Sequence, residues 1–261
     1  LFRSAAIFYY FLLFGVFVFV GQEEMQLFIP EWWYIREFLF QPGGFCAVAG
    51  QWIIQYYRQP MSAVVLHTVL LVGCGFMVYR ILRCFSDKTY LLFLSLLPVL
   101  YLVKMSIHGE YLVDGTVGVV LMLLALSVSL KVRRAGSIAG YGIASTLFLC
   151  GLTGLLSVCY AFLYTLLALL RYKTSRQRLA AAACLIPALF IYLFSGWLGI
   201  PVPLSDGWMP EAYLEIQRLP HYYMYRVWTF FTLSIVGVAL FARFVPVIGE
   251  KRSEEHTSEL Q

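Results

Sequence analysis

Eight runs of apolar residues divide this chain, and its lysines and arginines crowd into every second gap between the runs. A helix that spans a bilayer needs roughly 17 to 25 apolar residues, and somewhat fewer where its ends lie in the interface. Because the runs are continuously apolar and do not alternate with period two, they predict helices and not barrel strands. The runs lie at 5–20, 62–79, 89–103, 116–130, 139–151, 154–170, 179–198 and 228–241.

The composition indicates that lipid covers much of this apolar surface. Hydrophobic residues make up 61% of the chain and charged residues only 13%, which is more apolar surface than one soluble core of 261 residues can bury. We therefore expect an all-α fold, a polytopic helical membrane protein with about eight transmembrane helices.

The charges predict the orientation of these helices, because cytoplasmic loops carry an excess of lysine and arginine. With a cytoplasmic N-terminus, fourteen of the 19 basic residues lie inside: Arg3, Arg80, Arg83, Lys88, Lys131, Arg133, Arg134, Arg171, Lys173, Arg176, Arg178, Arg243, Lys251 and Arg252. Nine acids then lie outside: Glu23, Glu24, Glu31, Glu37, Glu110, Asp114, Asp206, Glu211 and Glu215.

The segment 139–170 tests this orientation, because it is almost unbroken apolar sequence with basic residues on both sides. As one helix with a rise of 1.5 Å per residue it would run about 48 Å, whereas a hydrocarbon core is roughly 30 Å thick. Basic flanks at both ends require that the chain return to the side it left. We predict a helical hairpin that turns at residues 151–154, with one long tilted helix as the alternative.

A single integral membrane domain is expected over 1–251, truncated at both ends. The segment 252–261 is hydrophilic and resembles the translation of a common sequencing adapter. Our hypothesis is that it is a technical scar.

The outer loop at 21–61 has a pattern of its own. Its second half has apolar residues at helical spacing and a second set that points the other way. The first set is Phe45, Val48, Ala49, Trp52, Ile53, Tyr56 and Tyr57, and the second is Gly50, Gln51, Gln55 and Arg58. This pattern predicts amphipathic helices that lie in the interface, with their tryptophans and tyrosines at headgroup depth.

Glu23 and Glu24, just beyond the first apolar run, are candidate catalytic residues. A carboxylate held near lipid yet reachable from water can bind a divalent metal or act as a base toward a hydroxyl group. Adjacent helical residues point roughly 100° apart, so at most one of them faces a cavity. We favour Glu24, which shares a face with Phe28; the alternative is that both acids are simply solvated.

Asp114 is the third catalytic candidate, because an acid at a membrane edge is a functional candidate by default. Glu110 lies four residues before it and His108 is close by, so a shared metal is one possibility. The candidate ligands for a divalent metal are therefore Glu24, Glu110 and Asp114. His67, within the second run, is expected to form a hydrogen bond to a neighbouring helix. The six cysteines form no Cys-x-x-Cys pair, and we expect all of them to be packing residues.

Several chemistries have no motif in this chain. It contains no phosphate-binding loop, no Rossmann glycine fingerprint and no zinc-protease helix. The basic residues are spread loop by loop and form no patch with interleaved aromatics, which argues against nucleic acid as a partner. Membrane lipids are the expected partners.

Three segments, residues 22–28, 41–44 and 51–57, carry a resemblance to known sequences. Together they resemble the first outer loop of an uncharacterised multi-pass family from Gram-negative, gut-type bacteria, which implies a location in the inner (cytoplasmic) membrane. More distantly, an acid in a long first outer loop with interfacial helices resembles the GT-C fold of glycosyltransferases. That resemblance implies that Glu23 or Glu24 assists metal binding or acceptor activation, with a polyprenyl-phosphate sugar as substrate. The aspartate-bearing motif usual in that fold is absent.

Three functional hypotheses follow, and the residues leave open whether the protein is an enzyme. The leading one is an integral inner-membrane protein of unknown activity that acts as a GT-C-like glycosyltransferase at the outer face on a lipid-linked sugar. The second is a transporter, for which inverted repeats and polar breaks at the bilayer midplane would be expected. The third is a non-catalytic membrane scaffold.

Overall fold

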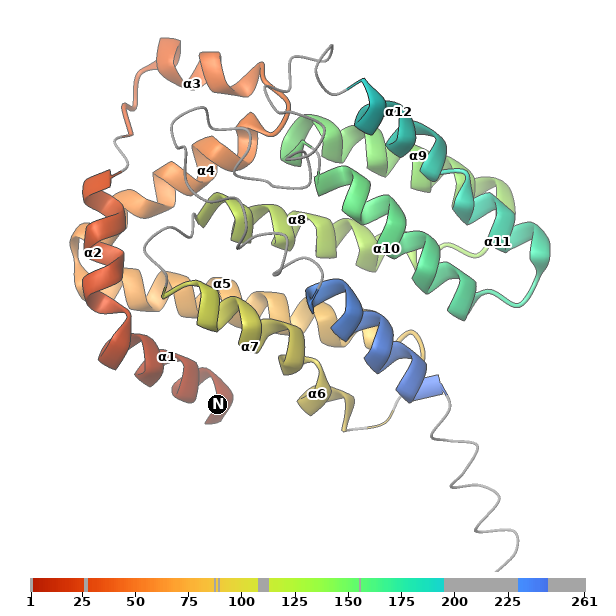
Figure 1. Cartoon of the computed structure of the whole chain (residues 1–261), viewed down its shortest axis with the longest axis horizontal. Coiled ribbons are helices and arrows are strands. Elements are labelled where there is room, and N and C mark those ends of the chain that lie inside the picture. The colour runs from red at the N-terminus through yellow and green to blue at the C-terminus, as the bar shows by residue number, and fades with distance from the viewer. Residues whose placement is uncertain are drawn as a thin grey trace, which may run out of the picture.

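A computed structural model describes residues 2–25, 28–86, 88, 90–107, 113–154, 156–194 and 230–243. All regular elements within these ranges are helices, which confirms the all-α prediction (Figure 1). They are α1 (Phe2–Phe14), α2 (Val16–Met25), α3 (Trp32–Leu39), α4 (Gly44–Ile54), η1 (Gln55–Arg58), α5 (Pro60–Leu82), α6 (Leu91–Leu94), α7 (Leu96–Met105), α8 (Val113–Ser129), α9 (Ala135–Thr153), α10 (Leu156–Arg171), α11 (Ser175–Ala182) and α12 (Leu185–Leu193), followed by a helix at Phe230–Arg243.

The described residues of each of the eight apolar runs are mostly helical, but fewer than eight described helices have the length of a membrane span. Among the described residues, three helices are long and apolar enough to cross a membrane: Pro60–Leu82, Ala135–Thr153 and Ser175–Leu193. The pair α1 and α2, bent by 69°, makes a fourth if it counts as one span. Four further apolar helices have only 10–17 residues: Leu91–Met105, Val113–Ser129, Leu156–Arg171 and Phe230–Arg243. Apolar composition predicted where helices form but overestimated how far they extend.

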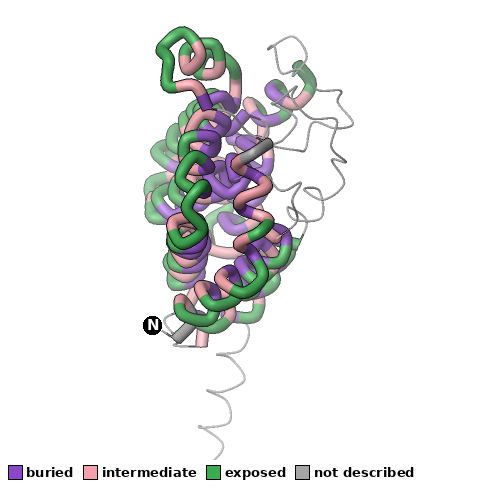
Figure 2. The backbone as a smooth tube through the Cα atoms, turned by 90° about the vertical axis from the view of Figure 1, so that its left-hand side faces the viewer, coloured by how far each residue is buried: buried purple, intermediate pink, exposed green. Residues whose placement is uncertain are grey.

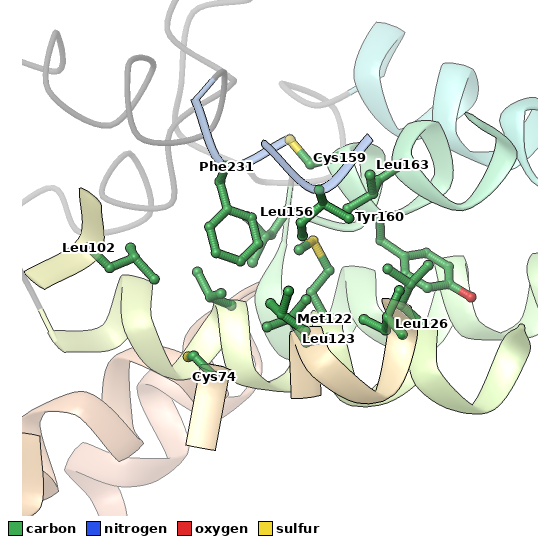
Figure 3. Packing of buried hydrophobic residues seen from close by; sticks show 14 of the residues in the cluster. Cys74, Leu102, Met122, Leu123, Leu126, Leu156, Cys159, Tyr160, Leu163 and Phe231 are labelled. Atoms are coloured by element: carbon green, nitrogen blue, oxygen red, sulfur yellow. The ribbon is translucent and has the colours of Figure 1, made fainter. Parts of the chain in front are cut away.

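Helix α8 lies at the centre of the bundle and packs against α4, α5, α9 and α10. Its Met122, Leu123 and Leu126 meet Leu156 and the other apolar residues of α10 that Figure 3 labels. A hydrogen bond of 2.7 Å between the hydroxyls of Ser129 and Tyr160 joins the same two helices. Because both apolar and polar groups of α8 are buried against neighbours, this helix fixes the positions of the surrounding ones.

Many residues along the helices are exposed (green in Figure 2), and large apolar side chains are common among them. Phe17 is 88% exposed, Ile186 72% and Phe148 68%, and these three belong to three different helices. The core is therefore enclosed by helices whose outward faces are themselves apolar.

The predicted hairpin in 139–170 is confirmed. Helix α9 ends at Thr153, α10 begins at Leu156, and the two helices pack against each other. Gly154 between them has φ 61° and ψ −129°, a conformation that residues with a β-carbon rarely adopt. The glycine allows the chain to turn back here, so the single tilted helix is excluded.

The first apolar run forms two helices and not one straight span, because the chain bends at Gly15. Phe11 before the bend and Phe19 after it lie 5.4 Å apart, measured between ring centroids. Both rings contact the imidazole of His67, at centroid distances of 4.9 and 5.0 Å. The bend thus closes two phenylalanines around a buried histidine of α5.

Candidate functional site

Asp114 is a buried acid in the first turn of α8, with only 7% of its surface exposed. A carboxylate is favoured at this position, because the N-terminus of a helix carries partial positive charge. Its Oδ1 accepts a hydrogen bond of 2.7 Å from the backbone N–H of Gly115. Asp114 precedes the predicted span at 116–130, so it belongs to the end of the molecule opposite the basic loop at 131–134.

Helix α4 covers Asp114, and Gly50 makes the close approach possible. A β-carbon at position 50 would lie 2.8 Å from the Cα, the Cβ and the backbone nitrogen of Asp114, closer than packed carbon atoms come. Two further contacts hold α4 in place. The Tyr34 hydroxyl donates to Gln51 Oε1 at 3.0 Å, and the Gly43 N–H donates to the Gly151 carbonyl at 3.1 Å.

A small pocket forms where α4, α8 and the α9–α10 turn meet. We call it the Asp114 pocket; its lining consists of Gly43, Cys46, Ala47, Asp114, Gly118, Thr153 and Leu156. It has room for about one water molecule or one hydroxyl group. Asp114 is the only residue in the lining with a carboxylate, so a proton released by a guest in the pocket has one evident acceptor.

Burial raises the pKa of the Asp114 carboxyl to about 7, although the hydrogen bond from the Gly115 N–H acts in the opposite direction. A carboxyl group with such a pKa can take up and release a proton near neutral pH, which is what a general base needs. Burial also raises the pKa of the Cys46 thiol, and the charge of Asp114 adds to this effect. Cys46 is therefore a neutral thiol and not a thiolate nucleophile.

The other predicted site residues do not gather around Asp114 within the described structure. Glu23 lies half-buried in α2. The Glu24 side chain and all of Glu110 fall outside the described residues, as do Asp206, Glu211 and Glu215, the other acids predicted to lie outside. No three His, Cys, Asp or Glu side chains in the described part of the chain are grouped so that they could hold a metal ion. Of the predicted site residues that the structure describes, Asp114 is thus the one that is buried and lines a pocket.

The segment of α4 and η1 follows the predicted pattern only in part. Phe45, Trp52 and Tyr56 are exposed, at 40%, 51% and 48%, and Gly50 and Gln51 are buried against the bundle. The end of the segment departs from the prediction: Tyr57 is fully buried, whereas Gln55 and Arg58 are exposed, because the chain changes at Gln55 to the tighter 3-10 helix η1.

Helix α3 buries none of its residues, and its Trp32 and Trp33 are exposed. The exposed aromatic side chains Trp32, Trp33, Phe45 and Trp52 are therefore not part of the pocket lining, whereas Phe38 of α3 packs against Ala47, which lines the pocket.

His67 has the hydrogen bond that its position predicts. Its Nδ1 lies 2.9 Å from the hydroxyl of Tyr57 in η1, and both side chains are fully buried. Among the described residues, His67 Nε2 has no partner. The pair of Tyr57 and His67 joins η1, which follows α4, to α5. Neither residue lines the Asp114 pocket.

Two features of the surroundings of Asp114 were not predicted from the sequence. The close approach at Gly50 links α4 to α8 over more than sixty positions of sequence, and a glycine among bulky residues was the only local sign of it. Cys46 was predicted to be a packing residue, and it is one, but it also lines the pocket beside Asp114. Both features depend on contacts between distant segments, which periodicity does not reveal.

Comparison with known proteins gives a family but no activity. The model of a family described as a family of unknown function (DUF6057) matches residues 1–258. No curated protein matches the chain, and no solved structure does.

Proposed function

The chain belongs to the DUF6057 family, a family of unknown function, and we propose that it is a polytopic membrane protein that transfers a sugar from a lipid-linked donor at its outer end. In this proposal the basic end lies in the cytoplasm and the Asp114 end lies on the outer side of a bacterial inner membrane.

The membrane location is supported by the separation of charge along the bundle. The basic residues at 80–88, 131–134, 171–178 and 243 share one end, where hydrogen bonds join their loops. Arg171 donates to the Cys84 carbonyl at 3.3 Å, and Tyr172 donates to the Val132 carbonyl at 2.7 Å. None of the described residues at this end is acidic. Such a distribution is the pattern of a protein with one cytoplasmic face.

The exposed apolar surface supports the same location. Soluble monomers rarely expose contiguous apolar patches larger than a few hundred Å², yet large apolar side chains are exposed on nearly every long helix here. A bilayer would cover them. In this arrangement, the four helices of 10–17 residues are buried among longer ones or extended by interfacial residues.

The transfer activity is supported by one observation: the buried Asp114 carboxyl has a pKa of about 7 and faces a pocket with room for a hydroxyl group. In the proposed reaction, the acceptor hydroxyl loses its proton to the Asp114 carboxylate as its oxygen forms a bond to the anomeric carbon of the sugar. The bond from that carbon to the phosphate oxygen breaks, and the polyprenyl phosphate leaves with the electron pair. A general base of this kind contributes roughly 10²–10⁴ to the rate.

Lipid-linked donors fit the position of the site. A polyprenyl chain remains in the bilayer while its phosphate lies at headgroup depth, and the exposed tryptophans of α3 and α4 would mark that depth beside the pocket. The acid that carries the reaction in this proposal is Asp114; Glu23 and Glu24 remain candidates for binding a divalent metal or the donor phosphate.

The proposal is tested by Asp114→Asn, which keeps the size of the side chain and removes the proton acceptor. Cells that carry the full-length gene with this change should lose the glycan product to the same extent as a deletion strain, by comparison of their extracted envelope glycans. Glu37→Gln is the matched control, because Glu37 is an exposed acid on α3 at the same end. Normal glycans in the Asp114→Asn strain, with the protein present at normal levels, would contradict the enzymatic proposal and favour a scaffold.

A further inference from the structure

We infer that two neighbouring basic loops form a binding surface for the phosphate of an anionic phospholipid headgroup. One loop joins α8 to α9 and the other joins α10 to α11. This inference rests on the proposed membrane location and goes beyond it, because the positive-inside rule requires basic loops but not a defined site.

The surface consists of five exposed cations: Lys131, Arg133, Arg134, Lys173 and Arg176. Two hydrogen bonds fix the loops against each other. The Tyr172 hydroxyl donates to the Val132 carbonyl at 2.7 Å, and Gln177 Nε2 donates to the Arg133 carbonyl at 2.7 Å. The five charges therefore belong to one small area and not to two independent loops. We call it the two-loop surface.

The surroundings of this surface leave its charge unbalanced. Helices α9 and α11, which pack side by side, both begin here (Figure 1). Neither has an acidic residue in its first turn, and neither has a side chain that caps its N-terminus. Each loop also follows a helix C-terminus, that of α8 or of α10, whose partial negative charge offsets the partial positive charge of the N-terminus. The charge of the surface is therefore that of its five cations, with no described acid to offset them.

Two of the five cations, Arg134 and Arg176, lie at helix N-termini, which is the reverse of the usual preference, whereas Lys131 and Lys173 follow the C-termini of α8 and α10. Cations are normally unfavourable at a helix N-terminus and favourable at a C-terminus. Elsewhere at the same end the chain follows that preference: Arg80 lies in the last turn of α5, Arg171 donates to the Cys84 carbonyl after α5, and Arg178 donates to the Tyr172 carbonyl after α10. Arg171 and Arg178 thus bind carbonyl groups at helix ends, whereas within the described part of the chain Arg134 and Arg176 have no such partner.

A lipid headgroup is the anion that fits the position of the surface. The flanking helices α9 and α11 have exposed apolar side chains, including Tyr141 and Leu179, within two turns of their N-termini. A phospholipid can place its acyl chains along these side chains while its phosphate receives hydrogen bonds from backbone N–H groups and from the five cations. A soluble phosphate would receive the hydrogen bonds but would not use the apolar side chains.

The experiment compares two double variants of the full chain, purified without lipid and mixed with phosphatidylglycerol or phosphatidylcholine. Native mass spectrometry then counts the lipid molecules retained. Arg134→Gln with Arg176→Gln removes one cation at each helix start and leaves three basic residues in the loops to maintain the orientation. Arg80→Gln with Lys88→Gln is the matched control, because it removes two exposed charges from the same end but away from the two loops.

The wild-type chain should retain phosphatidylglycerol in preference to phosphatidylcholine. Because each basic residue near an anionic lipid surface contributes about 1 kcal/mol, the first double variant should lose about tenfold or more of this retention, and the control about twofold or less. Arg134→Lys with Arg176→Lys should retain the lipid, which separates loss of charge from loss of fold.

Three results would overturn the inference: equal losses in both double variants, equal retention of the two lipids by the wild-type chain, or full displacement of the lipid by inorganic phosphate. Equal retention of the two lipids would leave the proposed membrane location intact. Retention of neither lipid would count against that location itself.

Discussion

Gly50 of α4 lies directly against the backbone of Asp114 in α8, so that a β-carbon at position 50 would come within 2.8 Å of three Asp114 atoms. The contact brings a helix from the segment 21–61 onto the first turn of the central helix. It buries the acid and shapes the pocket in front of it. The proposed role of Asp114 as a base therefore depends on Gly50, a residue that has no reactive side chain.

Replacing this glycine should disturb both packing and pocket. In Gly50→Ala the new methyl group overlaps the Asp114 backbone, and overpacking of this kind costs about 1–3 kcal/mol. Thermal unfolding of the purified chain should show the loss. Gly73→Ala is the control, because a β-carbon at position 73 meets nothing within 4 Å. Equal stability of the two variants would mean that α4 does not press on Asp114.

Stability should depend on pH through Asp114. Burial raises its pKa in the folded chain to about 7, whereas an unfolded aspartate titrates at about 3.9. Between these values the folded state holds a proton that the unfolded state has released, so stability falls as the pH rises through this window and levels off above it. Asp114→Asn does not titrate and should lack this decline. Parallel melting curves of the two proteins from pH 4 to 7 would argue against a raised pKa.

Gly154→Ala should weaken the hairpin of α9 and α10. At φ 61° and ψ −129° an alanine is strained by about 1–3 kcal/mol, so the turn either costs that energy or changes shape. Chemical unfolding in detergent would measure the loss. Gly151→Ala, three residues earlier in α9, has open space for its β-carbon and should be nearly neutral or stabilising.

Tyr57→Phe should destabilise the packing of η1 on α5. The change removes the hydroxyl that lies 2.9 Å from His67 Nδ1 and leaves a fully buried nitrogen without its partner, at a cost of about 1–3 kcal/mol. Tyr56→Phe is the natural comparison, since Tyr56 is the preceding residue and is 48% exposed. If both variants unfold at the same temperature, the hydrogen bond contributes nothing to the fold.

The sequence predicted the helical class, the position of the apolar helices and the hairpin, because these depend on local composition and on glycines in known places. It did not predict the bend at Gly15, since nothing near position 15 shows that Phe11 and Phe19 close around His67, a residue of a different helix far along the chain. It also overestimated the number of helices with the length of a span. A run of apolar residues indicates that the segment is buried, but not whether neighbouring helices or lipid bury it.

Only part of the candidate site could be predicted from the sequence, because the burial of its residues depends on segments that are far apart in the chain. Asp114 could be selected because an acid beside an apolar run is unusual, but its burial comes from α4, which pairs with α8 across a long interval of sequence. Cys46 and Gly50 look like ordinary packing residues until that pairing is known. Glu23, selected on the same grounds as Asp114, lies half-buried on α2, and nothing in its described surroundings distinguishes it.

The most direct test of the account asks whether the two ends of the bundle lie on opposite sides of a membrane. Gln41→Cys, between α3 and α4, and Lys131→Cys, between α8 and α9, place exposed thiols at the two ends. They are made in a chain whose incompletely buried cysteines, Cys84 and Cys150, are replaced by alanine. An impermeant thiol reagent should label Gln41→Cys in intact bacterial cells and label Lys131→Cys only after the membrane is opened. Labelling of both positions in intact cells, or of neither, would contradict the proposed orientation.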